Sequence, residues 1–187
     1  MVRSIRTLVA AFAIAAAAAV PAASPRPAVA ATAAEIDRGA DATLQALYEK
    51  IPAARTLGEQ AKGVLVFPNV VKAGFIVGGQ YGEGALRRNG HTAGYYNTLA
   101  ASYGLQAGAQ SFGYALFFMT DEALAHLDRS HGWEVGVGPS VVVLDAGAAR
   151  ALTTTTAKDD VYAFIFGQRG LMAGLGLQGS KISRIDR

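Results

Sequence analysis

The hydrophobic pattern begins with one continuous apolar run. Leu8 to Val20 has no polar residue, two arginines precede it, and Ala28-Val29-Ala30 has the A-x-A form of a cleavage site. These parts are typical of a secretory signal peptide over residues 1–30, and the run is short for a bilayer span. We expect cleavage after Ala30 or Ala23 and an exported, periplasmic or extracellular protein. The alternative is an uncleaved N-terminal anchor.

The pattern then takes on a helical period. Apolar residues recur at spacings of three and four from Glu35 to Ile51, and Thr32 with Glu35 matches a capping box. Pro52 suits the first turn of a second helix, Pro52–Ala61. The apolar stripe of the first helix either faces the core or lies in a lipid interface. Because its polar face carries both signs of charge, we expect it to face the core.

From Val64 the pattern changes to short β-branched and aromatic runs between glycines. Asn89-Gly90 is a strong signal for a two-residue hairpin turn, and Pro68-Asn69 is expected to end the first strand. Thr120 is predicted to cap a helix that ends at Gly132. Strands are predicted at Val64–Phe67, Phe75–Gln80, Ala85–Arg88, His91–Tyr96, Ser102–Gln110, Tyr114–Met119, Trp133–Val137, Ser140–Asp145, Thr153–Thr156, Val161–Phe166 and Leu171–Leu177.

This order of elements predicts an α+β fold in a single domain over residues 31–187. The sheet is expected to be mostly antiparallel and barrel- or sandwich-like, with N-terminal helices and one mid-chain helix. Strands and helices do not alternate along the chain, so the sequence does not indicate a parallel sheet.

One glycine template occurs three times: glycine, a bulky apolar residue, any residue, Ala or Val, glycine. It begins at Gly74, Gly104 and Gly170. Residues four apart on a strand share a face, so each copy is expected to leave one face bare where another backbone or a ligand can approach.

The charge of the chain lies mainly in its first segment. Residues 1–30 hold three of the 17 Lys+Arg and none of the 14 Asp+Glu, so the charges balance from Ala31 onward. The basic pI of the precursor therefore does not indicate nucleic-acid binding. The chain has no cysteine, which excludes disulfides, thiolate metal sites and acylation of an N-terminal cysteine.

No catalytic or metal-binding pattern is readable. The glycine-rich run from Gly78 to Gly84 leads into a hairpin, whereas a phosphate loop needs a helix directly behind it. The three histidines His91, His126 and His131 lack a metal-ligand spacing, and no G-x-S-x-G elbow is present. We expect no enzymatic activity, no cofactor and no metal.

Basic residues are in local excess at two places. Lys62, Lys72, Arg87 and Arg88 are accompanied by one acid between residues 60 and 120, and Lys181, Arg184 and Arg187 lie near the C-terminus. If the C-terminal strand pairs near Lys72, these residues form a positive patch that suits anionic lipid headgroups; otherwise they are a solvated rim. Tyr95, Tyr96 and Phe112 either supply interfacial contacts or belong to the core.

Long motifs resemble the SYLF-domain family. They are AKGVLVFPNVVKAGFIVGGQYGEGAL, GYYNTLAASYGLQAGAQSFGYALFFMT, the segment at Trp133 and FIFGQRGLMAGLGLQGSKI, and they cover Leu44 to Ile185. The resemblance implies phospholipid binding, with phosphoinositides as ligands in eukaryotic members, and no established catalysis. It implies roles for the first helix, with Arg38 and Lys50, and for Lys62 and Lys72. Many bacterial members resemble lipoproteins, but this chain has no cysteine to acylate.

These observations predict a non-catalytic protein of the bacterial cell envelope that binds anionic phospholipid or a membrane surface. The candidate lipid-binding residues are Arg38, Lys50, Lys62, Lys72, Arg87, Arg88, Lys181 and Arg184. The alternatives are a structural or adaptor protein that binds another envelope protein, and a hydrolase with a dispersed site.

Overall fold

A computed structural model describes residues 30–129, 132–145, 148–149, 158–170 and 179–187, with the backbone alone for residues 102–107. The predicted signal peptide and the strands predicted at Thr153–Thr156 and Leu171–Leu177 lie outside the described residues. The domain from Ala31 to Arg187 forms one compact unit. None of the helices within the described ranges is long and apolar enough to span a membrane.

Two helices precede the sheet, as predicted. They are α1 (Ala33–Lys50) and α2 (Pro52–Gln60). The capping box of α1 is formed: the Glu35 backbone N–H donates to Thr32 Oγ1 over 3.3 Å, and the Thr32 N–H donates to Glu35 Oε2 over 2.8 Å. The backbone hydrogen bond from Thr32 lowers the pKa of the Glu35 carboxyl. Ile36, Ala40 and Leu47 are buried, which confirms that α1 faces the core.

The centre of the fold is one long hairpin. Its strands are β1 (Gly63–Arg88) and β2 (His91–Phe118), which pair antiparallel along their whole length. Asn89 and Gly90 have φ of 51° and 78°, so the predicted two-residue turn is confirmed. The hairpin contains all six strands that were predicted separately in this region, and those shorter boundaries are wrong. Pro68 does not end a strand, because the register shifts there in a bulge that tolerates a residue without an N–H.

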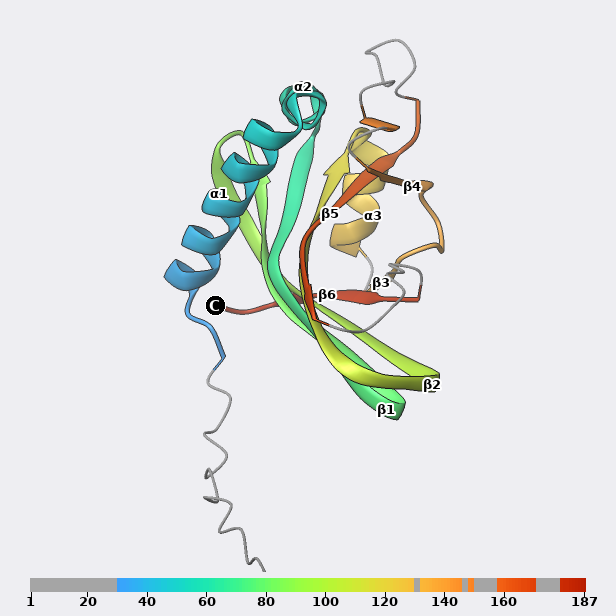
Figure 1. Cartoon of the computed structure of the whole chain (residues 1–187). Helices are drawn as coiled ribbons and strands as arrows, with labels where there is room; N and C mark the ends of the chain where they lie inside the picture. Colours follow the sequence, from blue (N-terminus) through green and yellow to red (C-terminus); the bar gives the residue numbers. More distant parts are fainter. Residues whose placement is uncertain (1–29, 130–131, 146–147, 150–157, 171–178) are drawn as a thin grey trace, which may run out of the picture. The chain divides into compact units, whose positions relative to one another are not determined.

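Among the described residues, one further helix and four strands follow the hairpin, and the strands extend the sheet beyond β2 (Figure 1). They are α3 (Asp121–Arg129), β3 (Trp133–Glu134), β4 (Val141–Leu144), β5 (Val161–Gly170) and β6 (Lys181–Ile185). The described strands follow the order β3-β6-β2-β5-β4, with β1 on β2. Every pairing is antiparallel except that of β4 with β5, so the mostly antiparallel α+β prediction is confirmed. The parallel pair was not predicted.

Two hydrophobic cores lie on opposite faces of the strands, as side-chain alternation requires. Val64 and Val66 pack with α1 and α2, whereas Leu65 and Phe67 pack with α3 and Trp133. Both faces of this part of the sheet are therefore covered. Between Val70 and Ala85, by contrast, β1 contributes no residue to either core.

Candidate functional site

The first glycine template forms a bend in β1. A Cβ added to Gly74 would lie 2.3 Å from the Cα of Gly78, so the backbone meets itself across four residues. Between them Ile76 has φ of 65°, and the register with β2 shifts at this point. The sequence predicted a bare face on a regular strand, and this is wrong for the first copy. Close approach occurs, but within one strand, and it bends the ribbon.

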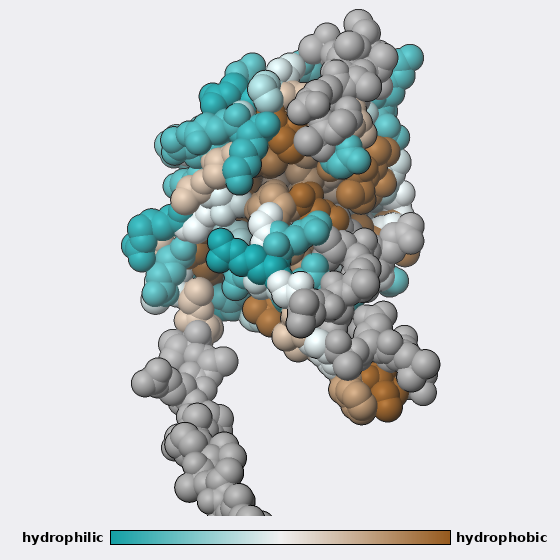
Figure 2. All heavy atoms as spheres, in the orientation of Figure 1, coloured by the Kyte–Doolittle hydropathy of each residue, from teal (hydrophilic) through white to brown (hydrophobic). Residues whose placement is uncertain are grey.

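Exposed hydrophobic side chains gather at this bend. Phe75, Ile76 and Val77 are 75%, 44% and 63% exposed, and we call these three residues the apolar tip. Figure 2 shows a hydrophobic surface at the projecting end of the β1–β2 ribbon. Three further exposed hydrophobic residues follow along the same ribbon: Val71, Tyr81 and Leu99. Apolar surface concentrated in this way is typical of an interaction site.

The ribbon around the apolar tip carries no negative charge. There is no Asp or Glu from Gly63 to Gly82 or from His91 to Phe118. Lys72 lies in β1 three residues before the tip. Lys181 in β6 is exposed and pairs with Leu99 of β2 on one side and with Glu134 of β3 on the other. The tip therefore combines exposed apolar side chains with Lys72 in a stretch of strand that contains no acidic residue.

Arg87 is engaged in a network that ties α1 to the hairpin. Its guanidinium lies 3.3 Å from Asp37 Oδ1 and 2.6 Å from Asp41 Oδ1, and it donates to the Asp37 carbonyl over 3.0 Å. Thr92 and Tyr95 donate to the Asp37 carboxylate over 2.7 and 2.9 Å. The hydrogen bond to Asp37 raises the pKa of the Tyr95 hydroxyl. This network gives Arg87 a structural role between α1 and β1.

The other predicted cations do not gather in one place. Lys62 lies 3.6 Å from Asp121, and Arg184 lies 3.9 Å from Asp128. Arg38 is exposed on α1, and Arg88 is exposed beside the hairpin turn. The condition for a joint patch is not met, because β6 pairs with Tyr95–Leu99 whereas Lys72 pairs with Gln110.

The three aromatic candidates lie away from the exposed surface. Tyr96 is 0% exposed and Phe112 is 2% exposed, so both belong to the core. Burial, reinforced by a hydrogen bond to Asp128, raises the pKa of the Tyr96 hydroxyl. Tyr95 is half-buried beside Asp37. Among the described side chains the exposed aromatic residues are instead Phe75 and Tyr81, neither of which the sequence analysis selected. The signal for Phe75 was an apolar triplet between glycines in a run without acids.

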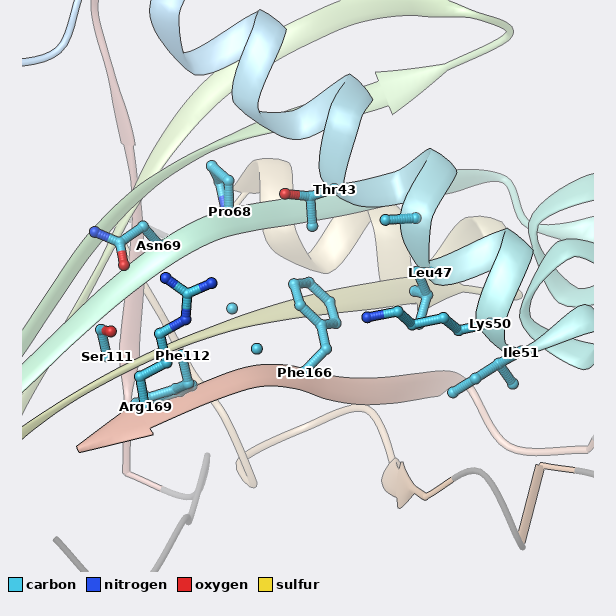
Figure 3. Close-up of a pocket in the computed structure, with 13 residues that line it drawn as sticks. Thr43, Leu47, Lys50, Ile51, Pro68, Asn69, Ser111, Phe112, Phe166 and Arg169 are labelled. Carbon is cyan, nitrogen blue, oxygen red and sulfur yellow. The ribbon is translucent and has the colours of Figure 1, made fainter. Parts of the chain in front are cut away.

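A pocket of about 360 Å³ lies between α1 and the sheet. Its residues come from α1 and from three neighbouring strands: Thr43, Ala46, Leu47, Lys50, Ile51, Pro68, Asn69, Ser111, Phe112, Gly113, Phe166, Gly167 and Arg169. Figure 3 shows Lys50 extending from α1 toward the Phe166 ring, with the Arg169 guanidinium beyond the ring beside Asn69 and Ser111. Lys50 was predicted as a site residue, whereas Arg169 was not.

Irregular pairing opens the sheet at this pocket. The register shifts between Phe67 and Val70 in β1, and again between Ser111 and Gly113 where β2 meets β5. A Cβ on Gly113 would lie 2.2 Å from the Phe166 ring, so glycine is needed for that ring to occupy its place. Bulges of this kind commonly redirect side chains beside functional sites.

The residues described offer binding chemistry rather than a catalytic constellation. Within them no three His, Cys, Asp or Glu side chains form a group that could hold a metal ion. His126 packs against the Trp133 ring at 6.5 Å between centroids, and His91 is exposed beside the hairpin turn. The chemically distinctive surfaces are the apolar tip and the pocket with its two cations.

Comparison with known proteins identifies a family for the second half of the chain. Residues 99–186 match the protein-family model described as "Ysc84: Las17-binding protein actin regulator". The match begins at Leu99 in β2 and includes α3 and every later described strand. A search of curated proteins found no match. The family is associated with lipid binding, and the resemblance stated from the motifs is confirmed over this segment. Residues 99–186 belong to the Ysc84/SYLF domain family.

Proposed function

We propose that this protein binds anionic phospholipid membrane surfaces without catalysing a reaction, and that it does so at the bacterial cell envelope after export. The observation that carries the proposal is the apolar tip, Phe75-Ile76-Val77, exposed at a bend whose strand segments Gly63–Gly82 and His91–Phe118 contain no acidic residue. The family's association with lipid binding supports the same ligand class.

The tip alone would give weak membrane binding. Full burial of a large apolar side chain contributes about 1.5–3 kcal/mol, and these three side chains are 75%, 44% and 63% exposed. Their exposed surface is therefore worth about 4 kcal/mol, which corresponds to a dissociation constant near ~1 mM. A second attractive contribution is needed for stable binding.

Positive charge supplies this contribution on an anionic membrane. Each Lys or Arg near such a surface adds about 1 kcal/mol, and the attraction weakens as salt screens it. Lys72 lies on the ribbon three residues before the tip. The segments Gly63–Gly82 and His91–Phe118 contain no Asp or Glu, so they add no repulsion from an anionic surface.

Vesicle sedimentation tests the proposal. The mature protein is mixed with vesicles of phosphatidylcholine alone or with phosphatidylglycerol, at low and at high salt. We expect binding to the anionic vesicles that decreases with salt. The double variant Phe75→Asn/Val77→Asn should bind at least roughly tenfold more weakly, because it removes most of the apolar contribution. Val143→Asn is the matched control, since Val143 is 52% exposed on β4, away from the bend.

The same experiment separates the alternative of an envelope adaptor. Negligible binding to both vesicle types at low salt would contradict the lipid proposal and favour a protein partner for the tip. Export is tested separately: the mass of the protein purified from a secreting bacterial host should correspond to a chain that begins at Ala31 or Ser24.

A further inference from the structure

The pocket between α1 and the sheet uses none of the residues of the apolar tip. Two cations reach it from different layers of the fold, Lys50 from α1 and Arg169 from β5. Neither has an ion-pair partner within the described part of the chain, and no acidic residue lines the pocket. Two cations at one concavity without a counter-charge favour an anionic ligand.

The neutral polar side chains narrow the class of anion. Figure 3 shows Asn69 and Ser111 beside the Arg169 guanidinium, so an amide, a hydroxyl and a guanidinium lie at the same end of the pocket. A guanidinium binds phosphate or carboxylate oxygens in pairs. A carboxylate has two oxygens, whereas a terminal phosphate has three strong acceptors and about −1.5 to −2 charge at neutral pH. The larger donor set therefore fits phosphate better.

The rest of the pocket is apolar. Leu47 and Ile51 of α1 line it together with Phe112 and Phe166 of the sheet. Its volume of about 360 Å³ is at the lower end of the range of small-molecule sites, roughly 300–1,000 Å³. The pocket thus offers apolar surface to the carbon portion of a ligand whose phosphate lies at the polar end.

We propose that this pocket binds a small organic phosphate monoester, with the phosphate held by Arg169, Asn69 and Ser111, and with Lys50 supplying further positive charge. The ester is either a soluble molecule or the exposed headgroup of a lipid. The site is separate from the apolar tip, so the inference does not depend on the proposed membrane binding.

Calorimetric titration of the mature protein tests the soluble source. Glycerol 3-phosphate is titrated into the wild-type chain, Lys50→Gln, Arg169→Gln and the control Arg129→Gln. Arg129 is exposed at the end of α3, and its replacement removes the same charge. Loss of a charged hydrogen bond should weaken binding about tenfold or more in the two pocket variants and leave the control unchanged. Because Lys50 and Arg169 are exposed, the variants should retain the wild-type thermal midpoint, which is measured alongside.

A second arm tests the lipid source. Vesicles containing phosphatidic acid, a monoester headgroup, are compared with vesicles of equal charge containing phosphatidylglycerol, a diester. A preference for phosphatidic acid that is lost in Arg169→Gln supports the lipid form of the ligand. The proposal is overturned if neither arm depends on Lys50 or Arg169, or if butyrate binds as tightly as glycerol 3-phosphate. If Phe75→Asn/Val77→Asn binds vesicles as tightly as the wild-type chain, the proposed membrane binding by the tip fails. The calorimetric test and the comparison of phosphatidic acid with phosphatidylglycerol still decide whether the pocket binds a phosphate monoester.

Discussion

Gly74 and Gly78 touch across the bend of β1: a Cβ on Gly74 would lie 2.3 Å from the Gly78 Cα and 2.8 Å from the Val77 carbonyl oxygen. The neighbouring atoms are backbone and have no rotamer with which to move aside. The exposure of the three intervening side chains therefore depends on a hydrogen atom in place of a methyl group at position 74.

Replacing Gly74 with alanine should destabilise the fold by about 1–3 kcal/mol, the usual cost of overpacking. Urea unfolding measures the loss. Gly79→Ala is the matched control, because the nearest atom to its added Cβ is 3.9 Å away, and its effect should stay within about 0.5 kcal/mol. Equal stability of the two variants would show that the bend does not require glycine at position 74.

Ile76 has a backbone conformation that β-branched residues rarely adopt. Its φ of 65° is in the left-handed region, where strain costs on the order of 1–3 kcal/mol. Ile76→Asn should raise the free energy of unfolding by about 1 kcal/mol, since asparagine tolerates this region, and should weaken vesicle binding because an apolar side chain is lost. A variant that is less stable and binds vesicles normally would contradict both parts of this explanation.

Arg87 should matter far more for stability than its neighbour Arg88. The Arg87 side chain is 13% exposed and contacts Asp37, Asp41 and Thr92, whereas Arg88 is exposed beside the turn. Arg87→Gln should destabilise by about 2 kcal/mol or more, since it leaves Asp37 partly buried without its counter-charge. Arg88→Gln should change stability by less than about 0.5 kcal/mol. Chemical denaturation of both variants decides this, and a double-mutant cycle with Asp37→Asn should show non-additivity.

Because its hydroxyl is buried, Tyr114 should lower the free energy of unfolding at alkaline pH. Its hydroxyl is buried without a hydrogen-bond partner among the described residues, and burial raises its pKa. Above the pKa of an unfolded tyrosine, about 10, the unfolded chain loses this proton while the folded chain retains it. The contribution to stability is therefore complete below that pH and is lost as the pH rises.

Tyr114→Phe should change stability little at pH 7, because no hydrogen bond is removed. Between pH 9 and 11 its thermal midpoint should fall less than that of the wild-type chain, with the two stabilities separating by up to about 1.4 kcal/mol per pH unit above the tyrosine pKa. Lysine titration is common to both chains. Parallel pH profiles would refute the assignment.

The sequence predicted the elements whose signals are local. The capping box at Thr32, the turn at Asn89-Gly90 and the helical periods each depend on a few neighbouring residues, and all are present. The bend was missed because the template at Gly74 satisfies a strand as well as a sharp turn. β-branched propensity also argues against positive φ at Ile76.

The candidate sites depend on contacts that the order of residues does not specify. Lys50 and Arg169 are separated by 119 positions in the sequence. They line one pocket only because α1 packs on β1 and β2, and β5 pairs with β2. Arg87 was a plausible lipid contact until Asp37 and Asp41 were found beside it. Two charged residues can look alike in sequence and differ in role, since the partners come from another element.

Insertion of the apolar tip into a bilayer is the central claim, and the absence of cysteine allows a direct measurement. Phe75→Cys and, as the control, Val143→Cys each provide one thiol for an environment-sensitive fluorophore. With phosphatidylglycerol vesicles that carry brominated acyl chains, we expect the label at position 75 to shift to the blue and to be quenched. The label at position 143 should do neither. Bound protein whose label at position 75 remains unquenched would contradict the claim.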